Sequence, residues 1–247
     1  MNTGIAARAA AACIAAIAWA GLALQGVVVY QENSSVLLTL WILFAFFTIT
    51  TNLLVAVVFT GIAAKAVSQL LWSQKGREEW FSLGENHERR RGFGLHQLRN
   101  RYNRTVFRSA WVVAGTMLSI LLVGVIYALL LHGLTELSGG SAVANVLVHM
   151  VTPVVVPLFW IFFVDKGGLT WRHPFLWAIY PLAYLAYGLT RGAATGKYPY
   201  PFMNVLSLGW EKTALNVFCI AVAFMLSGFA TVWIDRRLGP TRRDGGA

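Results

Sequence analysis

Long runs of apolar residues alternate along the chain with short polar or basic segments. A bilayer core is about 30 Å thick, so a helix that crosses it needs ~20 mostly apolar residues. Lipid offers no water to unpaired backbone groups, so runs of this length must be helical. The pattern predicts an all-α, polytopic membrane helical bundle that forms a single transmembrane domain. Six transmembrane helices are expected, at about residues 5–30, 36–64, 110–131, 142–164, 174–189 and 214–234.

The basic residues predict how these spans are oriented. The segment 65–109 carries ten of the 20 Lys and Arg residues, and the tail after residue 234 carries four more. The connections 31–35 and 132–141 carry none. Cytoplasmic loops of membrane proteins are enriched in Lys and Arg. We therefore expect the basic loop 65–109 and both termini to be cytoplasmic, which requires an even number of spans.

The first apolar run has two interpretations. It begins with Arg8 and an alanine-rich stretch and contains Ala18-Trp19-Ala20, which resembles the cleavage site of a signal peptide. The apolar run extends to Val29, however, whereas the core of a signal peptide has about 7–15 residues. An uncleaved first span is the favoured interpretation.

Composition agrees with a membrane protein and changes how the charge is interpreted. Hydrophobic residues make up 57% of the chain and charged residues 12%, against roughly 25% charged residues in soluble domains. The net charge of +10 would otherwise suggest a nucleic-acid partner. Because the charges lie between the apolar runs, we expect no nucleic acid. Instead, the loop 65–109 is expected to contact anionic lipid headgroups, with a protein partner as the alternative.

Neither cysteine indicates a metal site or a disulfide. Cys13 and Cys219 lie inside apolar runs and lack metal-ligand spacing, so both are interpreted as small core residues. No nucleotide-binding or haem motif occurs either, and we expect neither a metal nor a cofactor.

Polar residues inside predicted spans are costly to bury and are therefore the best candidates for chemistry. His149 lies about seven residues into its span, with Asn145 and Pro153 one turn away on the same face. A histidine at that depth must be neutral or paired, and a neutral imidazole can act as a base. The alternative is a histidine that only holds neighbouring helices together.

Thr48 and Asn52 form a second polar face, one turn apart in the run 36–64. A buried threonine usually bonds back to the carbonyl one turn earlier, which would make Thr48 structural. The Asn52 amide needs partners in a hydrocarbon environment, which favours a functional cluster. Counting from the helix ends places Thr48 and His149 at similar depth, between the outer surface and the midplane.

A stripe of aromatic residues follows helical spacing in the run 174–189 and beyond it. Tyr180, Tyr184, Tyr187 and Arg191 lie on one face. An interfacial aromatic belt with a snorkelling arginine accounts for the last two. Tyr184 is deeper, so substrate contact is the alternative for this stripe. The rigid aromatic segment 198–202 could cap a cavity that opens outward.

Together these motifs resemble the androgen-induced membrane hydrolase family, and most closely its bacterial six-span relatives. The resemblance rests on Phe47-Thr48 with Thr51-Asn52-Leu53, on His149 to Pro153, and on Tyr198-Pro199-Tyr200-Pro201-Phe202, in the order and spacing of the family. It covers nearly the whole chain from the second span onward. Eukaryotic members are transmembrane threonine hydrolases of fatty acid esters of hydroxy fatty acids.

The resemblance implies that Thr48 is the nucleophile and His149 the base, and that a lipid is the substrate. Thr48 matches better than Thr51 because it follows the paired aromatic residues. From their positions and residue types, Asn52 or Asn145 would orient the imidazole or donate to the oxyanion, and Arg191 and Lys197 would hold the carboxylate of a lipid substrate. The implied location is the inner (plasma) membrane of a bacterium. The alternatives are a lipid or small-molecule binding protein, a transporter, or a scaffold that recruits a partner through its basic loop.

Overall fold

The computed structural model describes residues 3–82, 110–134 and 137–239, and these residues form helices and connections without a strand. Much of the loop predicted at 65–109 lies outside the described residues. The helices are α1 (Thr3–Asn33), α2 (Val36–Leu43), α3 (Phe47–Ser82), a helix at Ala110–Leu131 that ends in the π-helical turn η2 (Tyr127–Leu131), α5 (Gly139–Val146), the π-helical turn η3 (Leu147–Val151), α6 (Thr152–Phe163), α7 (His173–Thr195), the 3-10 turn η4 (Pro201–Met203) and α8 (Val205–Leu238).

Five of the described helices are long and apolar enough to cross a membrane, which indicates a membrane protein. They are Gly4–Asn33, Phe47–Ala64, Ala110–Leu131, Gly139–Phe163 and Val205–Leu238. The sixth expected span, α7, has 23 residues and sufficient length, but it is not among the five. Its tyrosines and Arg191 make it less apolar than the others. Six spans with cytoplasmic termini therefore remain a prediction.

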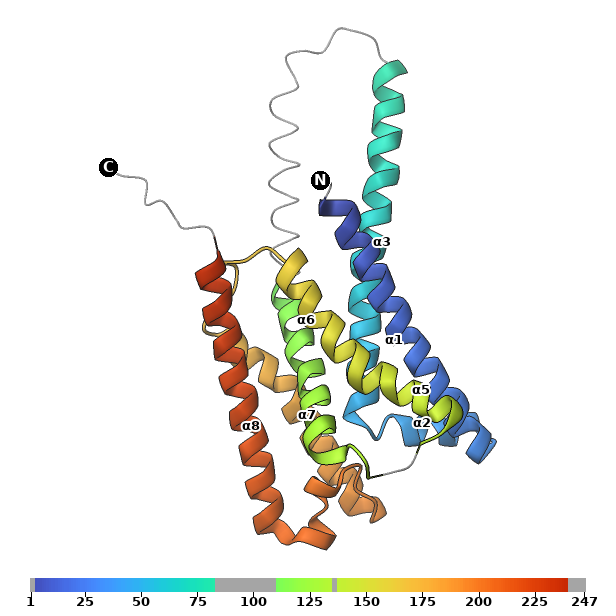
Figure 1. The fold of residues 1–247 in the computed structure, drawn as a ribbon, viewed down its shortest axis with the longest axis vertical. Coiled ribbons are helices and arrows are strands. Elements are labelled where there is room, and N and C mark those ends of the chain that lie inside the picture. Colours follow the sequence, from blue (N-terminus) through green and yellow to red (C-terminus); the bar gives the residue numbers. More distant parts are fainter. Residues whose placement is uncertain (1–2, 83–109, 135–136, 240–247) are drawn as a thin grey trace, which may run out of the picture.

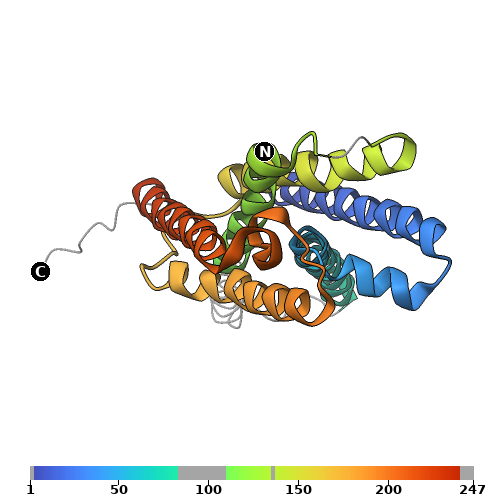
Figure 2. The same cartoon turned by 90° about the horizontal axis from the view of Figure 1, so that it is seen from below.

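The helices are arranged in two groups with the Ala110–Leu131 helix between them (Figures 1 and 2). α1 packs against α3, α5 and α6, and α7 packs against α8. Glycines allow the middle helix to approach both groups. A Cβ atom on Gly115 would lie 2.5 Å from the Trp177 ring of α7, and one on Gly124 would lie 2.6 Å from Pro153 of α6. Small residues at such crossings are typical of membrane helix packing.

The distribution of polar residues is inverted relative to a soluble protein. Large apolar side chains such as Leu37, Leu129 and Phe162 are 81%, 75% and 72% exposed. Thr51, Asn52 and Thr152 are completely buried among the helices. Exposed apolar surface on this scale suits contact with lipid. In such surroundings buried polar side chains need partners within the protein, and Asn52 and Thr152 find them where α3 faces η3.

The segment predicted as one span at 36–64 is broken in the structure. α2 ends at Leu43, and α3 begins at Phe47 after three residues without regular helical structure. Helix ends inside a membrane protein need side chains that bond the freed backbone groups. Tyr184 of α7 donates to the Ala45 carbonyl over 2.7 Å, and the Thr48 amide donates to the Tyr200 hydroxyl over 3.3 Å. The same α3 continues to Ser82, so the beginning of the segment predicted as the loop 65–109 is helical.

Candidate active site

The buried Thr48 hydroxyl lies within hydrogen-bonding distance of the His149 ring. Thr48 Oγ1 and His149 Nε2 are 3.1 Å apart, although 101 residues separate them in the sequence. Thr48 stands in the first turn of α3, just after the break, and only 5% of its surface is exposed. His149 stands in the middle of η3. A nucleophile is activated when a base lies about 2.6–3.2 Å away, and this pair meets that condition.

The other ring nitrogen of His149 fixes the direction of this hydrogen bond. His149 Nδ1 lies 3.3 Å from the backbone carbonyl oxygen of Asn145. A carbonyl can only accept a hydrogen bond, so Nδ1 carries the proton in the neutral ring. Nε2 then presents its lone pair to the Thr48 hydroxyl, which donates. Tyr127 stacks on the imidazole at a centroid distance of 4.4 Å and restrains its plane.

Pro153 explains why polar side chains gather at η3. In a π-helical turn the carbonyl of residue i accepts from the amide of residue i+5. For Val148 that residue is Pro153, which has no amide hydrogen. Asn52 Nδ2 donates to the Val148 carbonyl over 3.0 Å, and Thr152 Oγ1 donates to it over 3.2 Å. The turn that carries His149 is thereby tied to α3.

Asn52 positions both members of the pair instead of contacting the imidazole. Its amide nitrogen also donates to the Thr48 carbonyl over 2.9 Å, and its Oδ1 accepts from Thr152 Oγ1 over 2.8 Å. With the bond to Val148, these contacts use both donors and one acceptor of the side chain. Both amide hydrogens of Asn52 are therefore bonded to backbone carbonyls. In this structure Asn52 holds Thr48 and η3 in place, and it does not donate to the imidazole or toward an oxyanion as the sequence analysis expected.

Tyr200 is a site residue that the sequence motifs did not single out. Its hydroxyl lies 3.4 Å from Thr48 Oγ1 and accepts the hydrogen bond of the Thr48 amide. The side chain is buried against Phe46 and stacks on Phe202 at a centroid distance of 5.2 Å. The aromatic segment 198–202 was expected only to cap a cavity. A tyrosine in this segment does not by itself indicate a contact with Thr48. The contact exists because the helix break before Thr48 leaves the Thr48 amide without a helical partner.

The side chains of the remaining predicted site residues bond partners other than Thr48 and His149. Asn145 donates its side-chain amide to the Tyr127 hydroxyl over 2.6 Å, so it supports the ring that stacks on His149. Tyr184 bonds the α2–α3 break, as described above. Arg191 donates to the Tyr187 hydroxyl over 2.7 Å and lies 4.0 Å from the centre of the Trp41 ring. Tyr187 and Arg191 line neither of the cavities described next.

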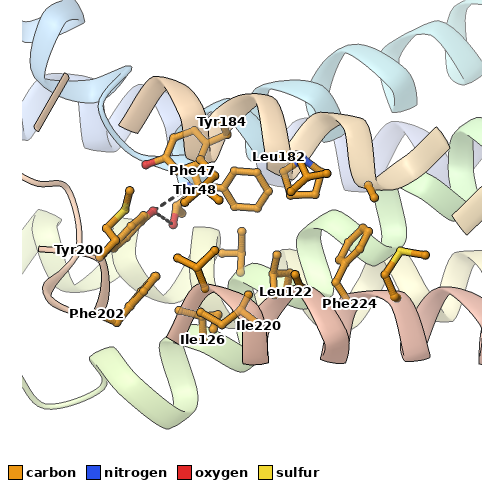
Figure 3. A pocket seen from close by; sticks show the side chains of 18 of the residues that line it. Phe47, Thr48, Leu122, Ile126, Leu182, Tyr184, Tyr200, Phe202, Ile220 and Phe224 are labelled. Carbon is orange, nitrogen blue, oxygen red and sulfur yellow. Dashed lines mark hydrogen bonds between the residues drawn. The ribbon is translucent and has the colours of Figure 1, made fainter. Parts of the chain in front are cut away.

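Two cavities meet at Thr48. The first has a volume of about 290 Å³ and runs between α7, α8 and the Ala110–Leu131 helix. Figure 3 shows it extending from Thr48 and Tyr200 at one end to Phe224 at the other. The second has a volume of about 420 Å³ and is lined by His149 and Asn145. Thr48 and Tyr200 border both cavities.

Among the described residues, no group of three or more His, Cys, Asp and Glu side chains could hold a metal ion. The arrangement at Thr48 combines a hydroxyl, an imidazole whose Nε2 faces that hydroxyl, and a phenol. These groups are the components of nucleophilic acyl transfer.

Comparisons of the chain with protein families, with curated proteins and with solved structures found no match.

Proposed function

We propose that the protein is an intramembrane hydrolase of lipid esters, with Thr48 as nucleophile and His149 as general base. The observation that carries the proposal is the 3.1 Å contact between the Thr48 hydroxyl and His149 Nε2 at the junction of two cavities. A threonine with a structural role would donate to the carbonyl one turn earlier, as Thr116 does to Val112 over 2.9 Å. Thr48 donates to an imidazole instead.

The reaction proceeds in two stages. His149 Nε2 removes the Thr48 hydroxyl proton as Oγ1 attacks the ester carbonyl carbon. The tetrahedral intermediate collapses, the bond to the alcohol oxygen breaks, and His149 gives its proton to that oxygen. Water then attacks the acyl-threonine, with His149 again accepting a proton. The second tetrahedral intermediate collapses, the bond between the acyl carbon and Thr48 Oγ1 breaks, and His149 returns its proton to Oγ1 as the carboxylic acid leaves.

Tyr200 is the proposed donor to the oxyanion. Its hydroxyl oxygen accepts the Thr48 amide hydrogen, and because the Thr48 hydroxyl donates to His149, the Tyr200 hydrogen points at Thr48 Oγ1 over 3.4 Å, beside the place where the oxyanion would form. A preorganised donor of this kind contributes about 3 kcal/mol to the stabilisation of a transition state in other enzymes. The start of α3 adds the positive end of a helix dipole at the same place.

The resemblance to the androgen-induced membrane hydrolases extends the proposal to the substrate and the location. Fatty-acyl esters, such as fatty acid esters of hydroxy fatty acids, are the proposed substrates, and the inner membrane is the proposed site of action. The topology with six spans, cytoplasmic termini and a basic loop at 65–109 against anionic headgroups belongs to the same proposal. An alternative is a protein that binds a lipid without cleaving it, which the apolar lining of the first cavity also favours.

Covalent labelling with a fluorophosphonate tests the pair. The purified protein in detergent should be labelled, and labelling should be lost in Thr48→Ala and reduced at least about a hundredfold in rate in His149→Ala. Thr51→Ala is the matched control, because the neighbouring Thr51 hydroxyl contacts Tyr180 at 3.1 Å and not His149. It should label like the wild type.

Two results would contradict the proposal in different ways. Labelling that persists in Thr48→Ala would remove Thr48 as the nucleophile. Wild-type protein that neither reacts nor hydrolyses any acyl ester, but binds a fluorescent fatty acid, would establish the binding protein instead. Each variant is compared with the wild type by size-exclusion chromatography and by its Tm, so that loss of fold is recognised.

A further inference from the structure

The two cavities differ in their relation to the reactive pair. Thr48 and Tyr200 border both, whereas His149 borders only the second. The first is lined almost entirely by apolar side chains, among them Leu122, Ile126, Leu182, Ile220 and Phe224 (Figure 3). The second also contains the polar side chains Gln25, Ser141 and Asn145. A substrate bound across Thr48 therefore has two unequal sides.

The position of His149 decides which part of the substrate lies on which side. This step rests on the proposed function. The proton that His149 removes from Thr48 must be delivered to the oxygen of the departing alcohol. That oxygen must therefore lie on the His149 side, which is the second cavity. The acyl chain, attached on the other side of the carbonyl carbon, then lies in the first cavity.

The chemistry of the linings agrees with this assignment. The first cavity offers an apolar path from Thr48 along α8, past Ile220 and Ala221, to Phe224. A flexible hydrocarbon chain fits this lining because it has no polar groups that would need partners there. The second cavity offers polar partners to an alcohol and to the water that cleaves the acyl-threonine. Deacylation requires water beside His149, and that is where the polar side chains lie.

We propose that the first cavity is the acyl-chain site of the enzyme and the second its alcohol and water site. The substrate is an ester with a straight, medium or long acyl chain, and the residues that set the accepted chain length are those at the Phe224 end. Ala221 lies one turn before Phe224 on α8, where a larger side chain would shorten the cavity. In this arrangement, acyl length and alcohol size are recognised at separate places.

Kinetics with two ester series test the assignment. 4-Nitrophenyl butyrate, octanoate and decanoate vary the acyl chain, and butyrate esters of small and bulky alcohols vary the leaving group. For the wild type, kcat/KM should rise from butyryl to octanoyl. In Ala221→Phe, kcat/KM for octanoyl should fall about tenfold or more relative to butyryl, since pocket contacts of this size are worth ~1–3 kcal/mol. Ala178→Phe, which fills the same cavity from α7, is the second variant.

Ser141→Phe is the mirror control in the second cavity. It should lower kcat/KM for bulky alcohols about tenfold and leave the acyl-length preference unchanged. The assignment is overturned if Ala221→Phe and Ala178→Phe discriminate among alcohols instead of acyl chains, or if they slow all esters equally while their Tm is that of the wild type. These outcomes differ from failure of the proposed function, in which Thr48→Ala hydrolyses the esters as fast as the wild type or no ester is cleaved at all.

Discussion

Two buried polar clusters lie in different parts of the bundle and satisfy their polar groups differently. Around Thr48, neutral side chains bond one another and the backbone: Asn52 joins α3 to η3, and His149 faces the hydroxyl. Near the end of α8, the buried carboxylate of Asp235 accepts from the amides of Gly167 and Leu169 over 3.0 and 2.8 Å. It holds the connection between α6 and α7 (Figure 1).

Burial of a polar group and access to a cavity do not coincide in the two clusters. Asp235 is completely buried and ionisable, which taken alone would mark a functional residue in a membrane protein. It borders neither of the two cavities, however, and both of its backbone partners belong to a connection. Thr48 is less unusual as a residue type, but it faces a base and two cavities. The two clusters differ in whether a side chain borders a cavity and faces a base, and not in how costly the side chain is to bury.

Removal of the Tyr200 hydroxyl should have the largest effect of the three changes that sharpen this comparison. In Tyr200→Phe the ring remains to pack against Phe202, while the proposed oxyanion donor is lost. We expect kcat for a butyrate ester to fall about a hundredfold with KM nearly unchanged, because the donor acts mainly on the transition state. Steady-state kinetics with the purified protein measure this. Tyr198→Phe, in the same segment but lining neither cavity, is the matched control.

An equal loss in both tyrosine variants would contradict the role of Tyr200, because it would place the effect in the folding of the segment 198–202. A rise in KM without a fall in kcat would also contradict it, since that pattern indicates lost binding of the ground state.

Removal of the Asp235 carboxylate should affect stability and leave the chemistry intact. Asp235→Ala leaves the buried Leu169 amide and the neighbouring Gly167 amide without their acceptor. An unsatisfied buried donor costs about 1–3 kcal/mol, so we expect a clearly lower Tm in detergent. The kcat of the protein that remains folded should stay within about twofold of the wild type. Asp235→Asn, which keeps one acceptor oxygen, should lose less stability.

A large fall in kcat in Asp235→Asn at a temperature well below its Tm would break the comparison. The two clusters would then be coupled through the bundle, and burial of an ionisable group would again indicate function.

The apolar pattern of the chain was sufficient to predict most of the helices, because each span needs a long run of apolar residues and little else. It did not predict the break between α2 and α3. Residues 44–46 contain neither proline nor glycine. At the break Tyr184 donates to the Ala45 carbonyl and Tyr200 accepts from the Thr48 amide, and both tyrosines are far away in the sequence. Such tertiary contacts leave no periodic signal.

The candidate site was predictable in the same uneven way. Thr48, Asn52 and His149 could be selected because polar groups are expensive inside a span. The pairing of Thr48 with His149 followed from the resemblance, and its geometry from the structure. The π-helical turn at η3 was hidden, although Pro153 was visible, because proline can disturb a helix in several ways. The role of Tyr200 required the position of a connecting segment, which one sequence does not contain.

The smallest effect is expected for a change at Arg191, near the C-terminal end of α7. Its position in the sequence predicts that Arg191 holds a substrate carboxylate, but its guanidinium donates to the Tyr187 hydroxyl and lies over the Trp41 ring, outside both cavities. Cation–π contacts at exposed sites are worth about 0.5–1 kcal/mol, so Arg191→Ala should lower the Tm only slightly. KM for an ester of a hydroxy fatty acid should equal that for the matching ester without a carboxylate, in the variant as in the wild type. A rise in KM confined to the ester with the carboxylate would extend the substrate site to the end of α7.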